Sequence, residues 1–143
     1  MIRALTKNDL REVAELSQKT FSDGWSAEMI EGSFNQNGFL SWVYLLDGKI
    51  VSAIATSYLF DEGEVLFIVT DKDYQRRGIA NELLQTALSE LLRRGVKTVF
   101  LEVRESNSGA IKLYNLNGFI KIAERQNYYG SETAVIMKAV LDL

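Results

Sequence analysis

Apolar side chains recur along the chain at two spacings, and each spacing predicts one type of element. An apolar residue at every third or fourth position predicts helices over residues 7–21, 24–34, 78–94 and 106–118. Alternating or continuous apolar runs predict strands over residues 2–5, two runs within 42–60, and 64–70, 97–103, 119–125 and 133–140. The order is therefore strand, two helices, three strands, helix, strand, helix and two strands.

Turn and cap residues refine these elements. Asp47-Gly48 lies between two apolar runs and predicts a tight hairpin turn. Ser26 is the expected N-cap of the second helix, Asn8 or Asp9 of the first, and Ser106 or Asn107 of the last.

The connections predict the sheet. The runs over 64–70 and 97–103 are nearly continuous in apolar residues, which is typical of strands buried on both faces. The helix between them predicts a right-handed crossover and a parallel pair, whereas the flanking hairpins are antiparallel. The expected fold class is α/β (α+β), with a mixed, mostly antiparallel sheet of six to seven strands. The parallel pair is central, and helices cover both faces.

Composition excludes several classes of protein. With 143 residues, the chain is expected to form a single domain over residues 1–143. A net charge of -3 does not support a surface that tracks nucleic acid. No apolar run approaches the roughly 20 residues that span a bilayer. The first residues lack the apolar centre of a signal peptide, so we expect a cytoplasmic protein without nucleic-acid or membrane partners.

Two absent residue types narrow the chemistry further. The chain has no Cys, which excludes disulfides, cysteine nucleophiles and thiolate metal sites. It also has no His, which excludes Ser-His-Asp machinery and histidine-based metal sites. We therefore expect no metal, and acid-base chemistry must come from Asp, Glu, Tyr, Lys or a bound reactant.

A possible phosphate site lies where the third predicted helix begins. Arg76 and Arg77 run into Gly78 at a helix end that already carries positive partial charge. A buried strand, a polar loop with Gly and a helix form an arrangement that binds phosphate through the free N–H groups of the first turn. The alternative is a solvated loop, which bare composition slightly favours, since neither Walker A nor G-x-G-x-x-G is present.

The motif around these arginines resembles a known family. "QRRGIA", residues 75–80, is similar to the Q/R-x-x-G-x-G/A signature of the GCN5-related N-acetyltransferases (GNAT), in which this loop binds the pyrophosphate of acetyl-CoA. The resemblance covers nearly the whole chain and the predicted order of elements. "LEVRESNSGAIKLYNLNGF" (101–119), "RQNYYGSETAVIMK" (125–138) and "GWS" (24–26) resemble the ribosomal-protein-alanine N-acetyltransferases. Those proteins acetylate the amino terminus of a ribosomal protein.

The resemblance implies a role for each matching residue. It implies that Glu102 is the proton acceptor and Tyr114 the proton donor, and that Asn107 contacts the arm of acetyl-CoA. Paired tyrosines, here Tyr128 and Tyr129, line the acceptor groove of the subfamily. The resemblance also implies two groups of residues that bind acetyl-CoA. The backbone of the first group pairs with the pantetheine arm: Ile68, Val69 and Thr70. The second group binds the pyrophosphate: Arg76, Arg77, Gly78, Ile79, Ala80 and Asn81.

Elementary chemistry is compatible with these roles but does not require them. An α-amino group, with a reference pKa near ~8 against ~10.4 for lysine, is the easier amine to neutralise with one carboxylate. Taken alone, Glu102 would be a rim charge or a partner of nearby Arg104, and Tyr114 a core residue. Leu113 and Phe119 can already supply the packing, which would leave Tyr114 able to face a ligand. Glu31, Glu64 and Glu132 are further candidates for contact with a basic acceptor, with surface acids as the alternative.

Three departures from the subfamily affect the acceptor. Lys72 follows Asp71 where Pro is common, Phe67 stands where Asn is common, and Ser52 where Gly is common. Phe67 could reshape the acceptor pocket. The leading hypothesis is an enzyme that acetylates the amino-terminal alanine of a ribosomal protein, as a monomer or weak homodimer. The alternatives are acetylation of protein lysine or a small-molecule amine, and a non-catalytic acyl-CoA-binding module.

Overall fold

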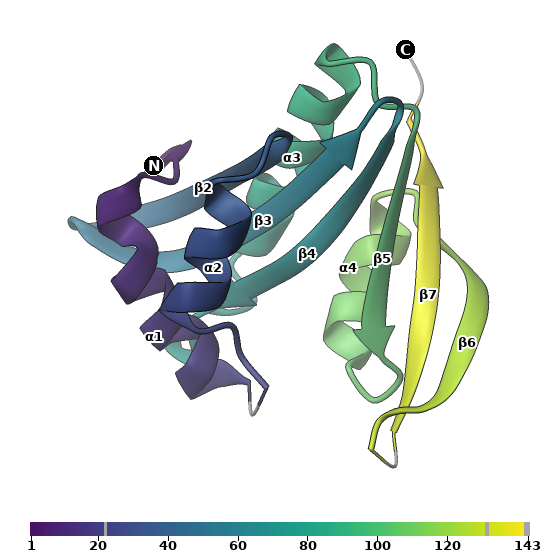
Figure 1. Ribbon diagram of the computed structural model, residues 1–143. Coiled ribbons are helices and arrows are strands. Elements are labelled where there is room, and N and C mark those ends of the chain that lie inside the picture. Colours follow the sequence, from purple (N-terminus) through teal and green to yellow (C-terminus); the bar gives the residue numbers. More distant parts are fainter. Residues whose placement is uncertain (22, 131, 142–143) are drawn as a thin grey trace. The chain divides into compact units, whose positions relative to one another are not determined.

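A computed structural model describes residues 1–21, 23–130 and 132–141 (Figure 1). The helices are α1 (Leu10–Thr20), α2 (Ala27–Phe34), α3 (Ile79–Arg93) and α4 (Ser108–Leu116), with short 3-10 turns η1 (Lys7–Asp9) and η2 (Lys72–Tyr74). The strands are β1 (Ile2–Ala4), β2 (Phe39–Leu46), β3 (Lys49–Leu59), β4 (Glu62–Thr70), β5 (Thr98–Arg104), β6 (Ile120–Tyr129) and β7 (Glu132–Val140). This order of helices and strands confirms the one predicted from the sequence.

The strands form one hydrogen-bonded sheet in the order β1-β2-β3-β4-β5-β7-β6. β4 and β5 are parallel, and their ladder has three residue pairs, from Glu62–Thr98 to Glu64–Phe100. The pairs β1–β2, β2–β3, β5–β7 and β6–β7 are antiparallel. The predicted mixed, mostly antiparallel sheet of six to seven strands is therefore confirmed, and in the described residues it has seven strands with one parallel pair.

The residues group into two compact units. Unit 1 contains residues 1–57 and 66–89, and unit 2 contains residues 58–65 and the described residues from 90 onward. Each unit consists of two segments that are not contiguous in the sequence, so neither corresponds to one half of the chain.

The core of unit 1 lies between helices and strands. α1 and α2 run across β2 and β3 (Figure 1) and bury apolar side chains against them. Val13 of α1, Ile30 of α2 and Val43 of β2 are at most 1% exposed. Full burial of such side chains contributes roughly 1.5–3 kcal/mol each, which exceeds what helix propensity supplies. The apolar spacing of α1 thus fixes which face of this helix meets the sheet.

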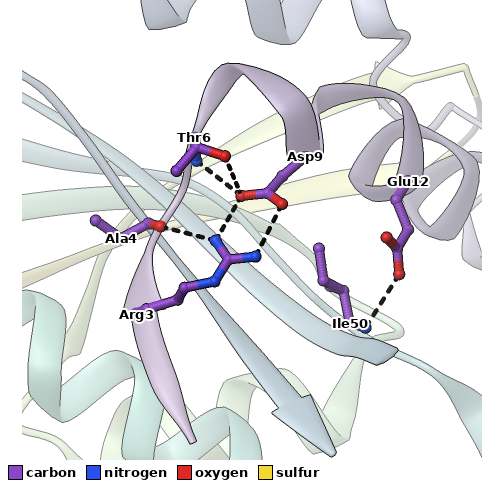
Figure 2. Close-up of polar contacts among 6 residues, drawn as sticks. All are labelled: Arg3, Ala4, Thr6, Asp9, Glu12 and Ile50. Atoms are coloured by element: carbon purple, nitrogen blue, oxygen red, sulfur yellow. Dashed lines mark hydrogen bonds and ion pairs between the residues drawn. The ribbon is translucent and has the colours of Figure 1, made fainter. Parts of the chain in front are cut away.

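A cluster of hydrogen-bonded polar residues lies at the start of α1 (Figure 2). Asp9 occupies the N-cap position, as predicted, but its carboxylate caps no N–H of α1. It accepts bonds from Arg3 at 2.6 and 3.0 Å and from the Thr6 N–H at 2.8 Å. The Arg3 guanidinium is the main reason that the pKa of Asp9 falls to about 2. Nearby, Glu12 accepts a 3.0 Å bond from the Ile50 N–H, which ties α1 to β3.

The Asp47-Gly48 turn is confirmed. Asp47 has φ 51° and Gly48 has φ 76°, the two left-handed residues that a type I′ hairpin needs. A bulge between Tyr44 and Leu45 shifts the register of β2 just before this turn. The turn and the bulge together set the register in which β3 pairs with β2.

The prediction that two strands are buried on both faces is wrong. Val99, Leu101 and Val103 of β5 are at most 7% exposed, whereas Phe100 is only partly buried and Glu102 is exposed. In β4 a run of apolar residues, Leu66–Ile68, is likewise only partly buried. A continuous apolar run is typical of a strand that is buried on both faces. The side chains on the second face are buried only if other residues pack over them, and here they are packed over only in part.

Candidate active site

The loop between β4 and α3, residues 71–78, is called the anion loop below. Two of its residues are in the left-handed region, Arg76 at φ 64° and Gly78 at φ 81°. For a residue with a side chain this conformation costs roughly 1–2 kcal/mol, so the surrounding contacts must hold Arg76 in it. A Cβ built on Gly78 would meet no atom within 4 Å, which means that the space before this backbone is open.

The loop leads into the first turn of α3, whose N–H groups have no intrahelical acceptor. The helix dipole adds positive potential there, and the side chains of Arg76 and Arg77 are exposed on the same short segment. Backbone donors, open space before Gly78 and two exposed cations form a suitable site for a diphosphate. The geometry therefore fits the sequence-predicted role of residues 76–81, which lie together in unit 1.

Asp71 anchors the start of the anion loop. Its buried carboxylate accepts a 3.0 Å bond from the Asp73 N–H and a 2.9 Å bond from Lys19 Nζ, and Lys49 Nζ lies 3.9 Å away. The Asp73 N–H and then the Lys19 ammonium hold the pKa of Asp71 below its usual value. The carboxylate therefore stays charged, and it ties α1 and the β2–β3 turn to the loop.

Two side chains within the loop fix its path. Gln75 Nε2 donates a 3.0 Å bond to the Thr70 carbonyl, and Arg77 donates a 3.0 Å bond to the Asp73 carbonyl. The Arg77 guanidinium also lies 5.1 Å from the centre of the Tyr74 ring. These contacts hold the loop in shape before any ligand binds, which lowers the entropy cost of binding.

The end of β4 carries the predicted backbone contacts, Ile68, Val69 and Thr70. All three lie beyond the last β4–β5 pair, which is at Glu64. Ser52 of β3 donates a 2.8 Å bond to the Val69 carbonyl and contacts the Thr70 hydroxyl at 2.8 Å. Ser52 thus holds this end of β4 in place. Gly is common at this position in the ribosomal-protein-alanine N-acetyltransferases that the sequence resembles. Sequence reasoning noted the departure but missed this role.

Phe67 packs against Trp25 in unit 1. Their ring centroids are 5.2 Å apart, and the ring planes are inclined by 50°. Both side chains lie at the edge of the unit 1 core and are partly buried. This pair accounts for the position of Phe67, a residue that the sequence marked only as a departure.

In unit 2, Glu102 projects from the face of β5 opposite the buried Leu101 and Val103, as the alternation predicted. The cation nearest to it is Arg125 of β6, whose guanidinium nitrogen lies 3.7 Å from Glu102 Oε1. The suggested partner Arg104 instead forms a 3.1 Å ion pair with Glu132. Glu102 is therefore accessible, and in the described part of the chain Arg125 is the cation within 4 Å of its carboxylate.

Asn107 caps α4, as one of the two predicted alternatives. Its Oδ1 accepts a 3.2 Å bond from the Ala110 N–H, so its amide nitrogen is the donor that remains for a ligand. The preceding turn is held by Glu132, which accepts bonds from the Ser106 N–H at 3.1 Å and from the Ser106 hydroxyl. The Ser106 donors, followed by Arg104, lower the pKa of Glu132.

Tyr114 is the most deeply packed side chain of α4. It is 7% exposed, and its ring lies edge-on to Phe119 with centroids 5.6 Å apart. Leu113 of the same helix is less buried, so Tyr114 itself supplies much of the packing. The side chains of Tyr128 and Tyr129 lie outside the described residues.

Two findings concern other classes of site. Among the described residues, no group of three or more Asp or Glu side chains is placed to hold a metal ion. In the same part of the chain, no helix combines the length and the apolar character that crossing a membrane requires.

Comparison with known proteins agrees with this geometry. The model of the acetyltransferase (GNAT) family matches residues 10–119. The [ribosomal protein bS18]-alanine N-acetyltransferase of Escherichia coli K12 is 35% identical over 140 residues, which are 95% of this chain and 94% of that protein. The Haemophilus ducreyi protein of the same name is 34% identical over 148 residues, covering 99% of this chain and all of that one.

Solved structures give the same result. The crystal structure of the E. coli ribosomal-protein-S18-alanine N-acetyltransferase superposes with a TM-score of 0.92 at 33% identity and covers 100% of this chain and 94% of that chain. Ard1 from Thermoplasma volcanium also gives 0.92, at 27% identity, and covers 100% and 98%. The family uses acetyl-CoA as its acetyl donor, for which the anion loop provides a suitable site. The chain belongs to the GNAT family of acetyltransferases.

Proposed function

We propose that this protein transfers the acetyl group of acetyl-CoA to the α-amino group of a protein, with the amino-terminal alanine of a ribosomal protein as acceptor. The observation that carries the proposal is the near full-length similarity to bS18-alanine N-acetyltransferases at 35% identity. The proposal places the protein in the cytoplasm, where ribosomal proteins are made. It requires no metal.

The donor side of the reaction falls to unit 1. The anion loop and the first turn of α3, residues 76–81, would hold the pyrophosphate through backbone N–H groups and two cations. The backbone of Ile68, Val69 and Thr70 would pair with the pantetheine arm and place the thioester. A backbone N–H of this strand would also stabilise the oxyanion, a role that needs no side chain. Asn107 of unit 2 would contact the arm through its amide nitrogen.

The acceptor side requires a neutral amine and an acid for the thiolate. Glu102 is exposed and would receive the proton of the α-ammonium, directly or through water. An α-amino group with a reference pKa near ~8 needs far less help than lysine at ~10.4. The Tyr114 hydroxyl, with a reference pKa near ~10, would protonate the departing thiolate, whose acid is near ~8.5.

The proposal is tested with three peptides of one sequence that begins with alanine. The first has a free amino terminus, the second has a blocked terminus and intact lysines, and the third has a free terminus and arginine at each lysine. Thiol release from acetyl-CoA is followed together with mass spectrometry of the peptide. We expect acetylation of the first and third peptides alone.

The other outcomes have defined meanings. Acetylation of the second peptide would contradict α-amino selectivity and indicate a lysine acetyltransferase. Acetyl-CoA binding without transfer to any peptide would contradict the amino-terminal proposal and favour a small-molecule amine or a non-catalytic module.

A further inference from the structure

Two buried serines in the sheet of unit 1 donate to a carbonyl of the neighbouring strand. Ser41 of β2 donates to the Ile54 carbonyl of β3 at 2.6 Å, and Ser52 of β3 donates to the Val69 carbonyl of β4 at 2.8 Å. Ser41 is 8% exposed and Ser52 is fully buried. The two bonds are alike in kind, but that of Ser52 reaches the strand end proposed to bind the pantetheine arm.

Ser52 makes a second contact at the same strand end. Its Oγ lies 2.8 Å from the Thr70 hydroxyl oxygen. A hydroxyl has only one proton to donate, and the Ser52 proton goes to the Val69 carbonyl, so the Thr70 hydroxyl donates to Ser52. The hydrogen bonds therefore run from Thr70 to Ser52 to the Val69 carbonyl. Ser52 thus holds both of the last two residues of β4.

These bonds determine which backbone groups of β4 point towards β3. The Val69 carbonyl accepts from Ser52, and the Asp71 N–H donates a 2.8 Å bond to the Val51 carbonyl of β3. Successive residues of a strand direct their N–H and C=O groups to opposite edges. The residues on either side of Val69 therefore direct their backbone groups away from β3.

Ile68 and Thr70 are these two residues, and both lie beyond the last β4–β5 pair, at Glu64. The Thr70 carbonyl already accepts a 3.0 Å bond from Gln75 Nε2. In the described chain this leaves the Ile68 carbonyl and the Thr70 N–H for a ligand. An acceptor and a donor two residues apart can pair with an amide-bearing chain as a neighbouring strand would, and the pantetheine arm carries amides.

We propose, on the basis of the function proposed above, that Ser52 is a positioning residue for the acetyl donor. It is buried and acts through Val69 and Thr70, whose fixed backbone aims the Ile68 carbonyl and the Thr70 N–H at the pantetheine arm. Without the Ser52 hydroxyl, a buried carbonyl and the Thr70 hydroxyl lose their partner, and the strand end rearranges to satisfy them. A misplacement of about 1 Å at the reacting group costs up to the order of 10² in rate.

The test compares Ser52→Ala with Ser41→Ala. Both variants remove a buried hydroxyl that donates to a carbonyl, so both should lower the melting temperature by a similar few degrees. Only Ser52→Ala should raise the Kd for acetyl-CoA, roughly 3- to 10-fold, and lower kcat roughly 10-fold. The KM for the free-terminus peptide should stay within about twofold in both. Wild-type Kd and kcat in Ser52→Ala would overturn the proposal and leave Ser52 a structural residue only.

A shorter ligand separates the pantetheine arm from the anion loop. Adenosine 3′-phosphate 5′-diphosphate is the nucleotide half of acetyl-CoA, with the diphosphate and without the arm. Calorimetric titration should give the same Kd for this nucleotide in the wild type and in Ser52→Ala, because the anion loop is unchanged. An equal loss of affinity for the nucleotide and for acetyl-CoA would overturn the proposal, since the effect would then lie at the anion loop.

A second variant covers the case that Ser52→Ala does not fold. Thr70→Val keeps the branched shape and removes only the hydroxyl that donates to Ser52. We expect its Kd for acetyl-CoA to rise roughly 2- to 3-fold and its Kd for the nucleotide to stay unchanged. Unchanged affinity for acetyl-CoA would overturn the role of the hydroxyl chain. These titrations need no acceptor, so a wild type that binds acetyl-CoA and acetylates no peptide would contradict the proposed function alone.

Discussion

Lys19 and Asp71 join the end of α1 to the start of the anion loop through a 2.9 Å ion pair. The two residues are 52 positions apart, and Asp71 is 3% exposed whereas the lysine side chain is 59% exposed. The same carboxylate caps η2 through the Asp73 N–H. Asp71 is therefore the residue through which the core of unit 1 holds the loop proposed to bind pyrophosphate.

Asp71→Asn should keep the cap of η2, because an amide oxygen still accepts from the Asp73 N–H. It should lose the ion pairs with Lys19 and Lys49, because the amide carries no charge. We expect a melting temperature lower by a few degrees, as for a loss of about 1 kcal/mol, and a Kd for acetyl-CoA raised roughly 3- to 10-fold. Calorimetry measures both. Asp73→Asn, an exposed neighbour, is the control and should change neither by a similar amount. An unchanged Kd in Asp71→Asn would show that the loop keeps its shape without this ion pair.

Gly78→Ala should weaken the anion loop through its backbone alone. Alanine at φ 81° costs roughly 1–2 kcal/mol, although no atom lies within 4 Å of the added Cβ. Gly95→Ala is a matched control, because Gly95 has φ 92° and a Cβ there would also meet no atom within 4 Å. Gly95 follows the end of α3, whereas Gly78 precedes its start. Both variants should lose similar stability in urea, but only Gly78→Ala should lose acetyl-CoA affinity. Equal affinities would remove Gly78 from the proposed donor site.

Asp9 should make stability depend on pH. Its pKa in the folded protein is about 2 against 3.8 for an ordinary aspartate, so its stabilisation is complete above the ordinary value and is lost as pH falls towards 2. Arg3 is about one-third exposed, so solvent screens part of its attraction to Asp9. We therefore expect Asp9 to contribute about 1–2 kcal/mol to the free energy of unfolding near neutral pH. Urea unfolding should show Asp9→Asn less stable than wild type by this amount near pH 7.

The difference between the two proteins should narrow near pH 2.5. Glu15→Gln, on the exposed side of α1, is the control and should match the wild type at both pH values. A gap of constant size from pH 7 to pH 2.5 would show that Asp9 stabilises by packing rather than by charge.

Tyr114→Phe tests the proposed acid without emptying its site. The ring keeps its edge contact with Phe119, so the melting temperature should change little, whereas kcat should fall on the order of 10²-fold. The Kd for acetyl-CoA should remain within about twofold, as expected when a hydroxyl acts only on the leaving group. Tyr58→Phe, whose hydroxyl accepts a 3.2 Å bond from Arg94, is the control. Normal kcat in Tyr114→Phe would leave this tyrosine a packing residue only.

The local pattern of the sequence determined the elements of the fold. Apolar spacing predicted the order of the four helices and seven strands found in the described residues. Asp47-Gly48 and Asn107 have the predicted turn and cap conformations. These features depend on residues a few positions apart, and the preferences involved are properties of short segments. The motif over residues 75–80 likewise pointed to the anion loop because backbone binding at a helix start requires a short, contiguous segment.

The partners of the charged residues and the burial of each strand face depend on how the strands are brought together in three dimensions. Glu102 has Arg125 rather than Arg104 beside it, Glu132 holds the turn before α4, and Glu64 shares a face with Glu102. Each of these contacts joins residues on different strands, so it depends on register and strand order. No spacing within one segment carries that information, because a side chain's pKa, exposure and partner are set by the atoms that folding brings to it.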